Sequence, residues 1–392
     1  MEFLGSLLGW LLLLIIVIGI LGYLFIEWQY RQRPGNQLEL NASGWTFDTY
    51  ESNHYAISLD AVFTNRTRTL EIFIPEVSID YELLSGDSLD GISVKTEITP
   101  QHEDFPARAD NYWFAYIVKV GQATNAKIKV DITGEDLSRL KSLWLKVNYL
   151  TYGPEGRIPK TGHLVVPLKF PNPENATSWR ENSVAHILPV PTHLLTNLDS
   201  TVEIVKKYVT PCAQPGDIVT IGETPVAIMQ GRLRHPTTVH PGWLAKRLCY
   251  YFMSTSSLAT ACGMQTLIDV SGPWKVGSAF AIGAVAKIFG SPGMFYNLAG
   301  EQARLIDDVT GTLPPFDQFI VLGPSRSQDL VNQIYQETGL QAAIVDVNDL
   351  KAVKILAKTQ ETNEQLLIQA LIDNPAGNAD EQTPVVLIRP KS

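Results

Sequence analysis

The order of hydrophobic and polar residues divides the chain into three regions. From Leu4 to Ile26 almost every residue is apolar. Residues 37–170 consist of short segments, several of which alternate apolar and polar residues, separated by Asn, Gly, Pro and Asp. From residue 184 onward, segments with helical spacing alternate with short apolar runs. The pattern predicts a mixed fold of α+β and α/β character, with an N-terminal transmembrane helix, an antiparallel β-sandwich-like domain and a C-terminal α/β domain.

The apolar run predicts a membrane anchor over residues 1–30. A helix of this length spans roughly 34 Å at about 1.5 Å per residue, which is enough for a bilayer core. The alternative is a secretory signal peptide, which usually has a basic leading region and a small-x-small cleavage site. Here only Glu2 is charged before the run, and the segment at its end, "GYLFIEWQYRQRPG", offers no such site. Trp28 and Tyr30 fit an interfacial aromatic belt, and Arg31 and Arg33 follow them. By the positive-inside rule we expect a single-pass protein whose C-terminal domains face the cytoplasm.

We divide the rest of the chain into a β-domain over 37–170, a polar linker over 171–183 and a C-terminal domain over 184–392. The composition of the chain narrows its possible functions. The formal net charge of −9 argues against a general nucleic-acid-binding protein, which normally has a basic face. Three cysteines do not make a disulfide framework and suit a reducing compartment. The sequence has neither a P-loop nor a G-x-G-x-x-G motif between a strand and a helix, so the standard nucleotide-binding motifs are missing.

One short segment concentrates chemically useful side chains. It reads "IDVSGPWKVGSAFAIG" over residues 268–283 and places a carboxylate, an aromatic ring, a cation and three glycines close together. The simpler interpretation is a tight connection between a strand and a helix. The alternative is a site for a metal and a phosphate-bearing ligand.

A second candidate joins a predicted strand to a predicted helix, with the sequence "FIVLGPSRSQDL" over residues 319–330. Exposed amide groups at a helix N-terminus suit a phosphate or a carboxylate, and Arg326 adds a bidentate donor. In the simpler interpretation, Ser325 or Ser327 only caps the helix.

Four weaker candidates carry clustered polar residues. They are Asp346, Asn348 and Asp349 after a strand; Glu301, Arg304, Asp307 and Asp308 in a predicted helix; Asp380 and Glu381 in a loop; and His235 and His240. The oxygen atoms of the first two groups suit a metal ion or a ligand hydroxyl, or otherwise a helix cap and a solvated ion-pair face. The loop acids either face a ligand or lie in a simple connection, and the histidines lack an evident acid partner or nucleophile.

Two of these segments resemble a known family. The segment Asp269–Gly283, "DVSGPWKVGSAFAIG", resembles the D-T-x-G-R-P-W-R-x-G-Q-x-D-x-A-I-G signature of the coenzyme F-420 gamma-glutamyl ligase family. Upstream, Pro215–Arg232, "PGDIVTIGETPVAIMQGR", is similar to the G-D-I-V-V-V-x-x-K-x-x-S-K-x-E-G-R motif of that family. The resemblance covers roughly residues 184–310.

The resemblance implies a ligase-like C-terminal domain that forms an amide bond between glutamate and a small-molecule carboxylate, using GTP and a divalent metal, Mg²⁺ or Mn²⁺. An acyl-phosphate supplies the leaving group that a carboxylate lacks, and the metal offsets phosphate charge. It implies Asp269 as metal ligand and Lys275 and Arg232 as catalytic residues. With Arg326 added from the second candidate, the expected cofactor-binding residues are Gly216, Asp217, Gly231, Gly272 and Arg326. A homodimer is a further expectation.

The sequence also departs from the family pattern. The motif lysines fall at Thr224 and Ile228, and the signature threonine falls at Val270. The second aspartate of the signature and a central Asn-Ala-Gly-Val-Asp metal motif are missing. Three hypotheses follow: a divergent ligase, a non-catalytic ligand- or partner-binding module at the membrane, and a structural envelope protein that uses the sandwich for contacts.

Overall fold

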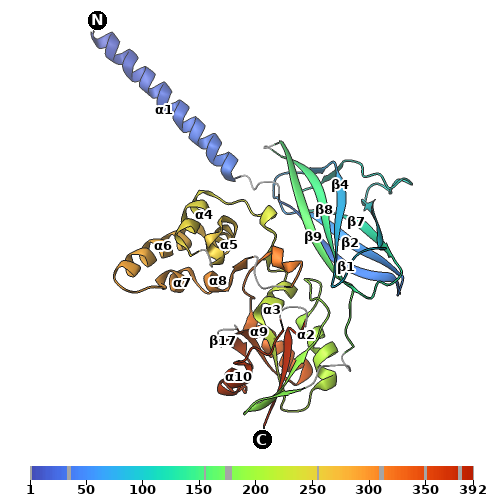
Figure 1. The fold of residues 1–392 in the computed structure, drawn as a ribbon. Coiled ribbons are helices and arrows are strands. Elements are labelled where there is room, and N and C mark those ends of the chain that lie inside the picture. Colours follow the sequence, from blue (N-terminus) through green and yellow to red (C-terminus); the bar gives the residue numbers. More distant parts are fainter. Residues whose placement is uncertain are drawn as a thin grey trace.

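The computed structural model begins with one long helix, α1 (Glu2–Gln32), followed by a β-domain and a C-terminal domain (Figure 1). Within α1, Gly9–Tyr30 is long and apolar enough to cross a membrane, and none of this span is buried by the rest of the protein. A signal sequence near the N-terminus also meets this criterion of length and composition. The structure describes residues 2–32, 37–153, 156–172, 179–253, 256–308, 313–347, 351–377 and 382–391.

The β-domain consists of antiparallel strands, as the alternating pattern predicts. One sheet has the strand order β1-β2-β7-β5 and the other the order β4-β8-β9, and β3 and β6 form a separate pair. The strands are β1 (Leu38–Glu51), β2 (His54–Asn65), β3 (Ile72–Ile74), β4 (Val77–Ser85), β5 (Ser93–Gln101), β6 (Tyr116–Val118), β7 (Ala123–Thr133), β8 (Leu140–Gly153) and β9 (Gly156–Pro167).

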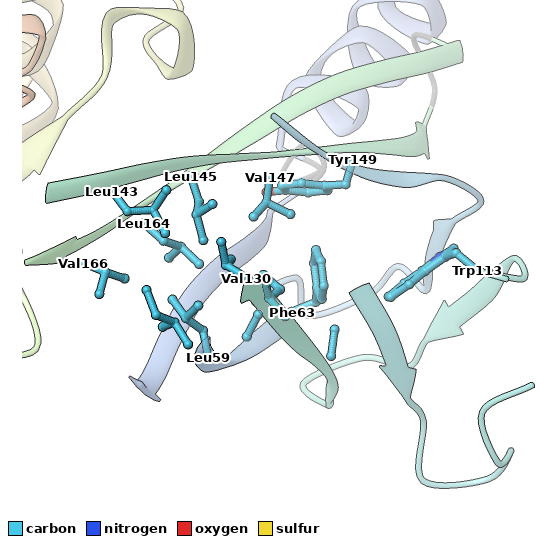
Figure 2. Packing of buried hydrophobic residues seen from close by; sticks show 14 of the residues in the cluster. Leu59, Phe63, Trp113, Val130, Leu143, Leu145, Val147, Tyr149, Leu164 and Val166 are labelled. Atoms are coloured by element: carbon cyan, nitrogen blue, oxygen red, sulfur yellow. The ribbon is translucent and has the colours of Figure 1, made fainter. Parts of the chain in front are cut away.

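The two sheets enclose one apolar core (Figure 2). Phe63 and Val130 belong to the four-stranded sheet, Leu145 and Val147 belong to the three-stranded sheet, and all four are fully buried. Because successive side chains point to opposite faces of a strand, residues two apart enter the same core. The alternation in the sequence therefore becomes the inner and outer faces of the sandwich.

The C-terminal domain is built on a six-stranded sheet with the order β10-β11-β18-β12-β16-β17, in which β12 and β16 are parallel and the other neighbours antiparallel. Helices α2, α3 and α9 cover one face of the sheet, and α10 covers the other. This agrees with the predicted α/β character. The elements are β10 (Arg180–Glu181), β11 (Ala185–Val190), α2 (Thr201–Ile204), β12 (Ile218–Gly222), α3 (Glu223–Met229), α9 (Ser327–Thr338), β16 (Gln341–Val347), β17 (Val353–Lys358), α10 (Glu364–Leu371) and β18 (Val385–Pro390).

Part of the predicted linker over 171–183 belongs to this sheet. Arg180–Glu181 forms the edge strand β10, which pairs with β11. An ion pair between Lys391 and Glu181 holds the same edge. Residues 173–178 lie outside the described residues.

Residues 236–306 form a helical lobe that projects from the sheet (Figure 1). The lobe has its own apolar core, which includes Met264, Leu267, Val276 and Phe295. A small sheet with the order β13-β15-β14 joins it to the rest of the domain. The elements are β13 (Leu233–Arg234), α4 (Trp243–Leu248), α5 (Ala261–Ser271), α6 (Pro273–Ile288), α7 (Met294–Ala299), α8 (Gln302–Leu305), β14 (Asp307–Asp308) and β15 (Ile320–Val321).

The segment 268–283 joins two helices, so the expected strand before Asp269 is wrong. Thr260 caps α5 by accepting a hydrogen bond from the backbone N–H of Gly263. The buried residues Met264, Leu267 and Ile268 recur at helical spacing. The apolar run before Asp269 is therefore the inner face of a helix.

The helix predicted for residues 301–308 is also shorter than expected. It ends at Leu305, because Asp307 and Asp308 pair with β15 as the strand β14. Arg304 and Asp308 are therefore not one turn apart on a helix, as the expected ion-pair face requires.

The β-domain and the C-terminal domain meet through an apolar and aromatic cluster. Trp144 of β8 is fully buried there and packs with residues of the C-terminal domain that include Ile228 and Phe319. The His163 ring of β9 stacks on the His235 ring, with centroids 4.1 Å apart. This junction joins strands β8 and β9 of the sandwich to the base of the helical lobe.

Candidate functional site

Two segments singled out in the sequence meet in space although 95 residues separate them. The side-chain amide of Gln230, in the turn after α3, donates to the Ser325 carbonyl at 2.9 Å. Its oxygen accepts from the Ser325 backbone N–H at 2.7 Å. We call residues 230–232 together with 323–326 the turn–loop cluster. It places the end of one family-like motif against the loop that precedes α9.

Arg232 connects the parts of this cluster by hydrogen bonds. Its Nε donates to the Gly323 carbonyl at 2.6 Å, and its Nη2 donates to Gln302 Oε1 at 3.3 Å. The same Gln302 oxygen accepts from the Gly323 backbone N–H at 3.1 Å. Burial, and then the nearby Arg234, lower the pKa of Arg232. Because its Nε and Nη2 both donate to protein groups of this cluster, Arg232 positions the loop.

The outer side of the cluster has an unusual backbone. Gly231 has a φ of 65° and Arg326 a φ of 49°, both in the left-handed region that disfavours residues with a Cβ. Arg326 occupies the N-cap position of α9, and its side chain forms no capping hydrogen bond. The expected serine cap is wrong, because neither Ser325 nor Ser327 occupies that position. The exposed Arg326 and the start of α9 are chemically suited to an anionic group.

Gly216 and Asp217 belong to a different setting, at the start of β12. Gly216 makes a turn with a φ of 92°. Asp217 is buried and forms a two-point ion pair with Arg389 of β18, at 2.9 and 2.8 Å. The Asp217 carboxylate raises the pKa of Arg389. Asp217 also accepts from the Gln214 N–H at 2.8 Å, so its contacts join two neighbouring strands.

Asp269, Gly272 and Lys275 lie at the junction between α5 and α6. Asp269 accepts from Arg234 Nη1 at 2.6 Å and from the Gln265 amide at 2.7 Å. Its side chain is 38% exposed. Gly272 has a φ of 87° and precedes Pro273 at the start of α6. Lys275 is exposed and lies beside Gly300.

The described residues contain no group of three or more His, Cys, Asp or Glu side chains that could hold a metal ion. At a metal site Asp269 would therefore supply one carboxylate ligand, and water would supply most of the others. To bind the metal, Asp269 would first have to give up its contact with Arg234. The side chains of Asp307 and Asp308 fall outside the description, and Asn348, Asp349, Asp380 and Glu381 lie outside the described residues.

The structure places His235 in the domain junction. Burial, followed by the charge of Lys146, lowers the pKa of His235. Burial, with His235 and Lys146 as further causes, lowers the pKa of His163 to about 3. Both ring nitrogens of His163 are buried with no hydrogen-bond partner. The exposed His240 lies outside this stacked pair.

Sequence reasoning missed two residues of the turn–loop cluster. Gln230 occupies the position of the motif glutamate, so the motif marked its place but gave no reason to assign it a role. Gln302 belongs to a segment in which only the charged residues indicate a site. An amide that both donates and accepts can bind one backbone segment at two points, which explains both contacts with the loop.

Comparisons with solved structures give alignments at low identity. The GAE domain of yeast GGA1 aligns at 16% identity over 35% of this chain and 100% of that chain, with a TM-score of 0.19. The GAE domain of GGA2p from Saccharomyces cerevisiae aligns at 18% identity over 35% and 95%, also with a TM-score of 0.19. Domains D2 and D3 of the major pilin SpaD from Corynebacterium diphtheriae align at 9% identity over 48% and 55%, with a TM-score of 0.15. No curated protein matches the chain.

A family model does match part of the chain. It describes the N-terminal Ig-like domain of F420-0:gamma-glutamyl ligase and covers residues 39–170. The match lies in the β-domain, whereas the motif resemblance lies in residues 184–310. The β-domain is thus an Ig-like domain similar to that of F420-0:gamma-glutamyl ligase.

Proposed function

We propose that this protein is a membrane-anchored binding module related to gamma-glutamyl ligases, whose C-terminal domain binds a ligand bearing a phosphate or a carboxylate at the turn–loop cluster. The observation that carries the proposal is the meeting of Gln230 with the loop that presents Arg326 at the start of α9. An exposed guanidinium beside the first amide groups of a 12-residue helix offers both charge and directed donors to an anion.

The two candidate aspartates already form ion pairs within the protein, which favours binding without catalysis. Asp217 and Asp269 each contact an arginine of the protein itself. A carboxylate that already neutralises an arginine is a poorer ligand for a metal, because the arginine must first be displaced. The motif lysines are also replaced, by Thr224 and Ile228.

A divergent ligase is the second candidate, and the family-model match in residues 39–170 favours it. In that case GTP and Mg²⁺ or Mn²⁺ would support amide formation between glutamate and a carboxylate substrate. Asp269 would bind the metal, Lys275 and Arg232 would be catalytic, and Gly216, Asp217, Gly231, Gly272 and Arg326 would surround the cofactor. A homodimer belongs to this hypothesis.

The test is the melting temperature of the full chain in detergent with phosphate, glutamate, GTP or ATP, each with and without Mg²⁺ or Mn²⁺. A ligand that prefers the native state raises the melting temperature. We expect phosphate or nucleotide to raise it without metal, and Arg326→Gln to abolish the rise. Arg108→Gln is the matched control, because Arg108 is exposed on the β-domain.

The outcomes separate the two candidates. A rise that needs both nucleotide and metal, and that Asp269→Asn removes, would favour the ligase. The absence of any rise, in a chain that melts cooperatively, would overturn the anion site.

The anchor is a separate part of the proposal. Gly9–Tyr30 crosses the bilayer once, and the other domains lie on the cytoplasmic side. The full chain should therefore stay in the membrane during alkaline carbonate washing, and external protease should not cleave the β-domain in intact cells. Release by carbonate, or a processed chain that lacks α1, would identify a signal sequence instead.

A further inference from the structure

We propose that the helical lobe (residues 236–306) rests on an anionic lipid bilayer and inserts the exposed face of α6 into its interface. This inference rests on the membrane anchor of the proposed function but assigns the lobe a contact of its own. It starts from the two faces of α6.

Both faces of α6 are apolar. One face is buried, with Val276 and Ala279 in the core of the lobe and Gly283 against the backbone of Phe295. The opposite face is open. At 100° per residue, Trp274, Ala281, Val285 and Ile288 fall within about 40° of one line along the helix, and the exposed Ser278 is the polar residue among them. We call this line, together with Ile282 and Phe289 at its edge, the α6 stripe.

The α6 stripe is unusually exposed for large apolar side chains. Trp274 is 90% exposed, and Ile288 and Phe289 are each 82% exposed. An exposed apolar residue is ordinary when it stands alone, whereas a continuous apolar surface marks an interaction site. A helix with two apolar faces needs a second apolar environment beyond its own protein core.

Further aromatic residues are exposed elsewhere on the lobe, beside α6. Tyr251 lies against Phe280, with ring centroids 5.4 Å apart, which brings the turn after α4 beside α6. Tyr250, Tyr251 and Trp243 are 84%, 69% and 73% exposed. Trp and Tyr are the side chains most suited to the headgroup region, because each combines an apolar ring with a polar group.

The charge of the lobe is opposite to that of the whole chain. Residues 236–306 contain five basic and two acidic residues, whereas the chain has 31 basic and 40 acidic residues. Both acidic residues are paired with cations outside the lobe, Asp269 with Arg234 and Glu301 with Lys354. Lys275 and Lys287 belong to α6 itself. A basic surface with exposed aromatic rings complements an anionic bilayer.

The start of β1, which follows the anchor in the chain, lies close to the base of the lobe. The Leu38 carbonyl, at the start of β1, accepts from Lys160 Nζ at 3.2 Å. Lys160 lies three residues before His163 on β9, about 10 Å along the strand, and His163 stacks on His235. Five residues separate α1 from Leu38 and span at most about 20 Å. The anchor therefore holds the lobe near the membrane surface.

A second copy of the chain is a poorer occupant of the stripe. In a two-fold symmetric contact the same surface meets itself, so the lobe, with five basic and two acidic residues, would face an equally basic surface. Like charges across an interface are unfavourable. An anionic bilayer has the opposite charge and is already within reach.

The experiment reconstitutes the full chain in vesicles of phosphatidylcholine with and without phosphatidylglycerol. The native cysteines are replaced by serine, and a fluorophore sensitive to its environment is attached at Ser291→Cys, in the exposed turn after α6. The control label is at Ser52→Cys, at the far end of β1 from Leu38, about 45 Å away along the strand. Quenching by lipids that carry doxyl groups reports contact with the bilayer.

We expect anionic vesicles to quench the label at position 291 and not the label at 52. The triple variant Trp274→Ser, Ile288→Ser, Phe289→Ser should lower the quenching at 291 to the control level. Because its changes are exposed, the variant should keep its melting temperature and its resistance to carbonate.

Three results would overturn the inference. An unquenched label at 291 on a chain that resists carbonate would refute the lobe contact and leave the anchor intact. Energy transfer between labels at 291 on different chains, without lipid quenching, would assign the stripe to a second copy. Release of the chain by carbonate would refute the anchor and, with it, the access of the lobe to the bilayer.

Discussion

The β-domain and the helical lobe use their apolar residues in opposite ways. In the β-domain, large residues such as Phe63 and Val130 are fully buried between two sheets. In the lobe, Trp274 and Phe289 are almost fully exposed. The first region buries residues such as Phe63 and Val130 between its own sheets, so its stability depends on packing. The second region leaves large apolar side chains exposed, which indicates an interaction surface outside its own core.

The sharpest test of this contrast makes the same change in both regions. Phe63→Ala should reduce the free energy of unfolding by about 3–5 kcal/mol, because it removes a buried ring and leaves a cavity. Phe289→Ala should change it by less than about 0.5 kcal/mol, because the ring is exposed. Chemical denaturation of the full chain in detergent measures both. Equal losses would mean that Phe289 has a packing partner and would break the comparison.

The two ion pairs offer a second contrast. Asp217→Asn should cost about 3 kcal/mol, because it leaves Arg389 beside a buried group with no compensating charge. Asp269→Asn should cost no more than about 1 kcal/mol, because that pair with Arg234 is partly exposed and solvent screens it. The free energy of unfolding distinguishes them. A large loss for Asp269→Asn would indicate a structural role at the α5–α6 junction.

These contrasts show what the sequence could predict. The apolar run of α1 and the alternation in residues 37–170 are local patterns with a fixed period, so the long helix and the antiparallel strands were predictable. The connection at 268–283 was not, because a short apolar run before Asp269 fits a strand and the inner face of a short helix equally well. Helix α8 is too short for its spacing to stand out.

The candidate site depended on contacts that no local pattern contains. The approach of Gln230 to Ser325 joins residues far apart in the sequence, and only the fold shows it. The same holds for Asp217, which directly precedes β12, and Arg389 of the neighbouring strand β18, which are 172 residues apart in the sequence. The sequence could propose chemically useful residues, but it could not show which of them already had partners.

The domain junction should make stability depend on pH. Burial lowers the pKa of His163 to about 3, from an ordinary value of 6.5, so the unfolded chain takes up a proton first as the pH falls. The stabilisation is complete above pH 6.5 and decreases toward pH 3, by up to about 1.4 kcal/mol per pH unit. His163→Phe should flatten this slope, measured by denaturation between pH 7 and pH 4. His240→Gln is the exposed control.

An unchanged slope in His163→Phe would assign the acid sensitivity to another buried group. His102 is the clearest alternative, because burial lowers its pKa to about 4 within the β-domain. A His102→Phe variant in the same series separates the junction from the sandwich.

The smallest expected effect concerns the charge of the lobe. Lys275→Gln, next to Ile282 on the helix surface, should weaken the docking of the lobe on an anionic bilayer by about 1 kcal/mol, the usual contribution of one basic residue near such a surface. In the vesicle experiment, the variant should need more phosphatidylglycerol for half-maximal quenching at position 291, and added salt should reduce the difference, because salt screens exposed charges. Lys129→Gln, an exposed change on β7, should have no effect. If both variants behave alike, apolar contact alone places the lobe on the membrane, and the contrast between the two regions lies in their exposed rings and not in their charge.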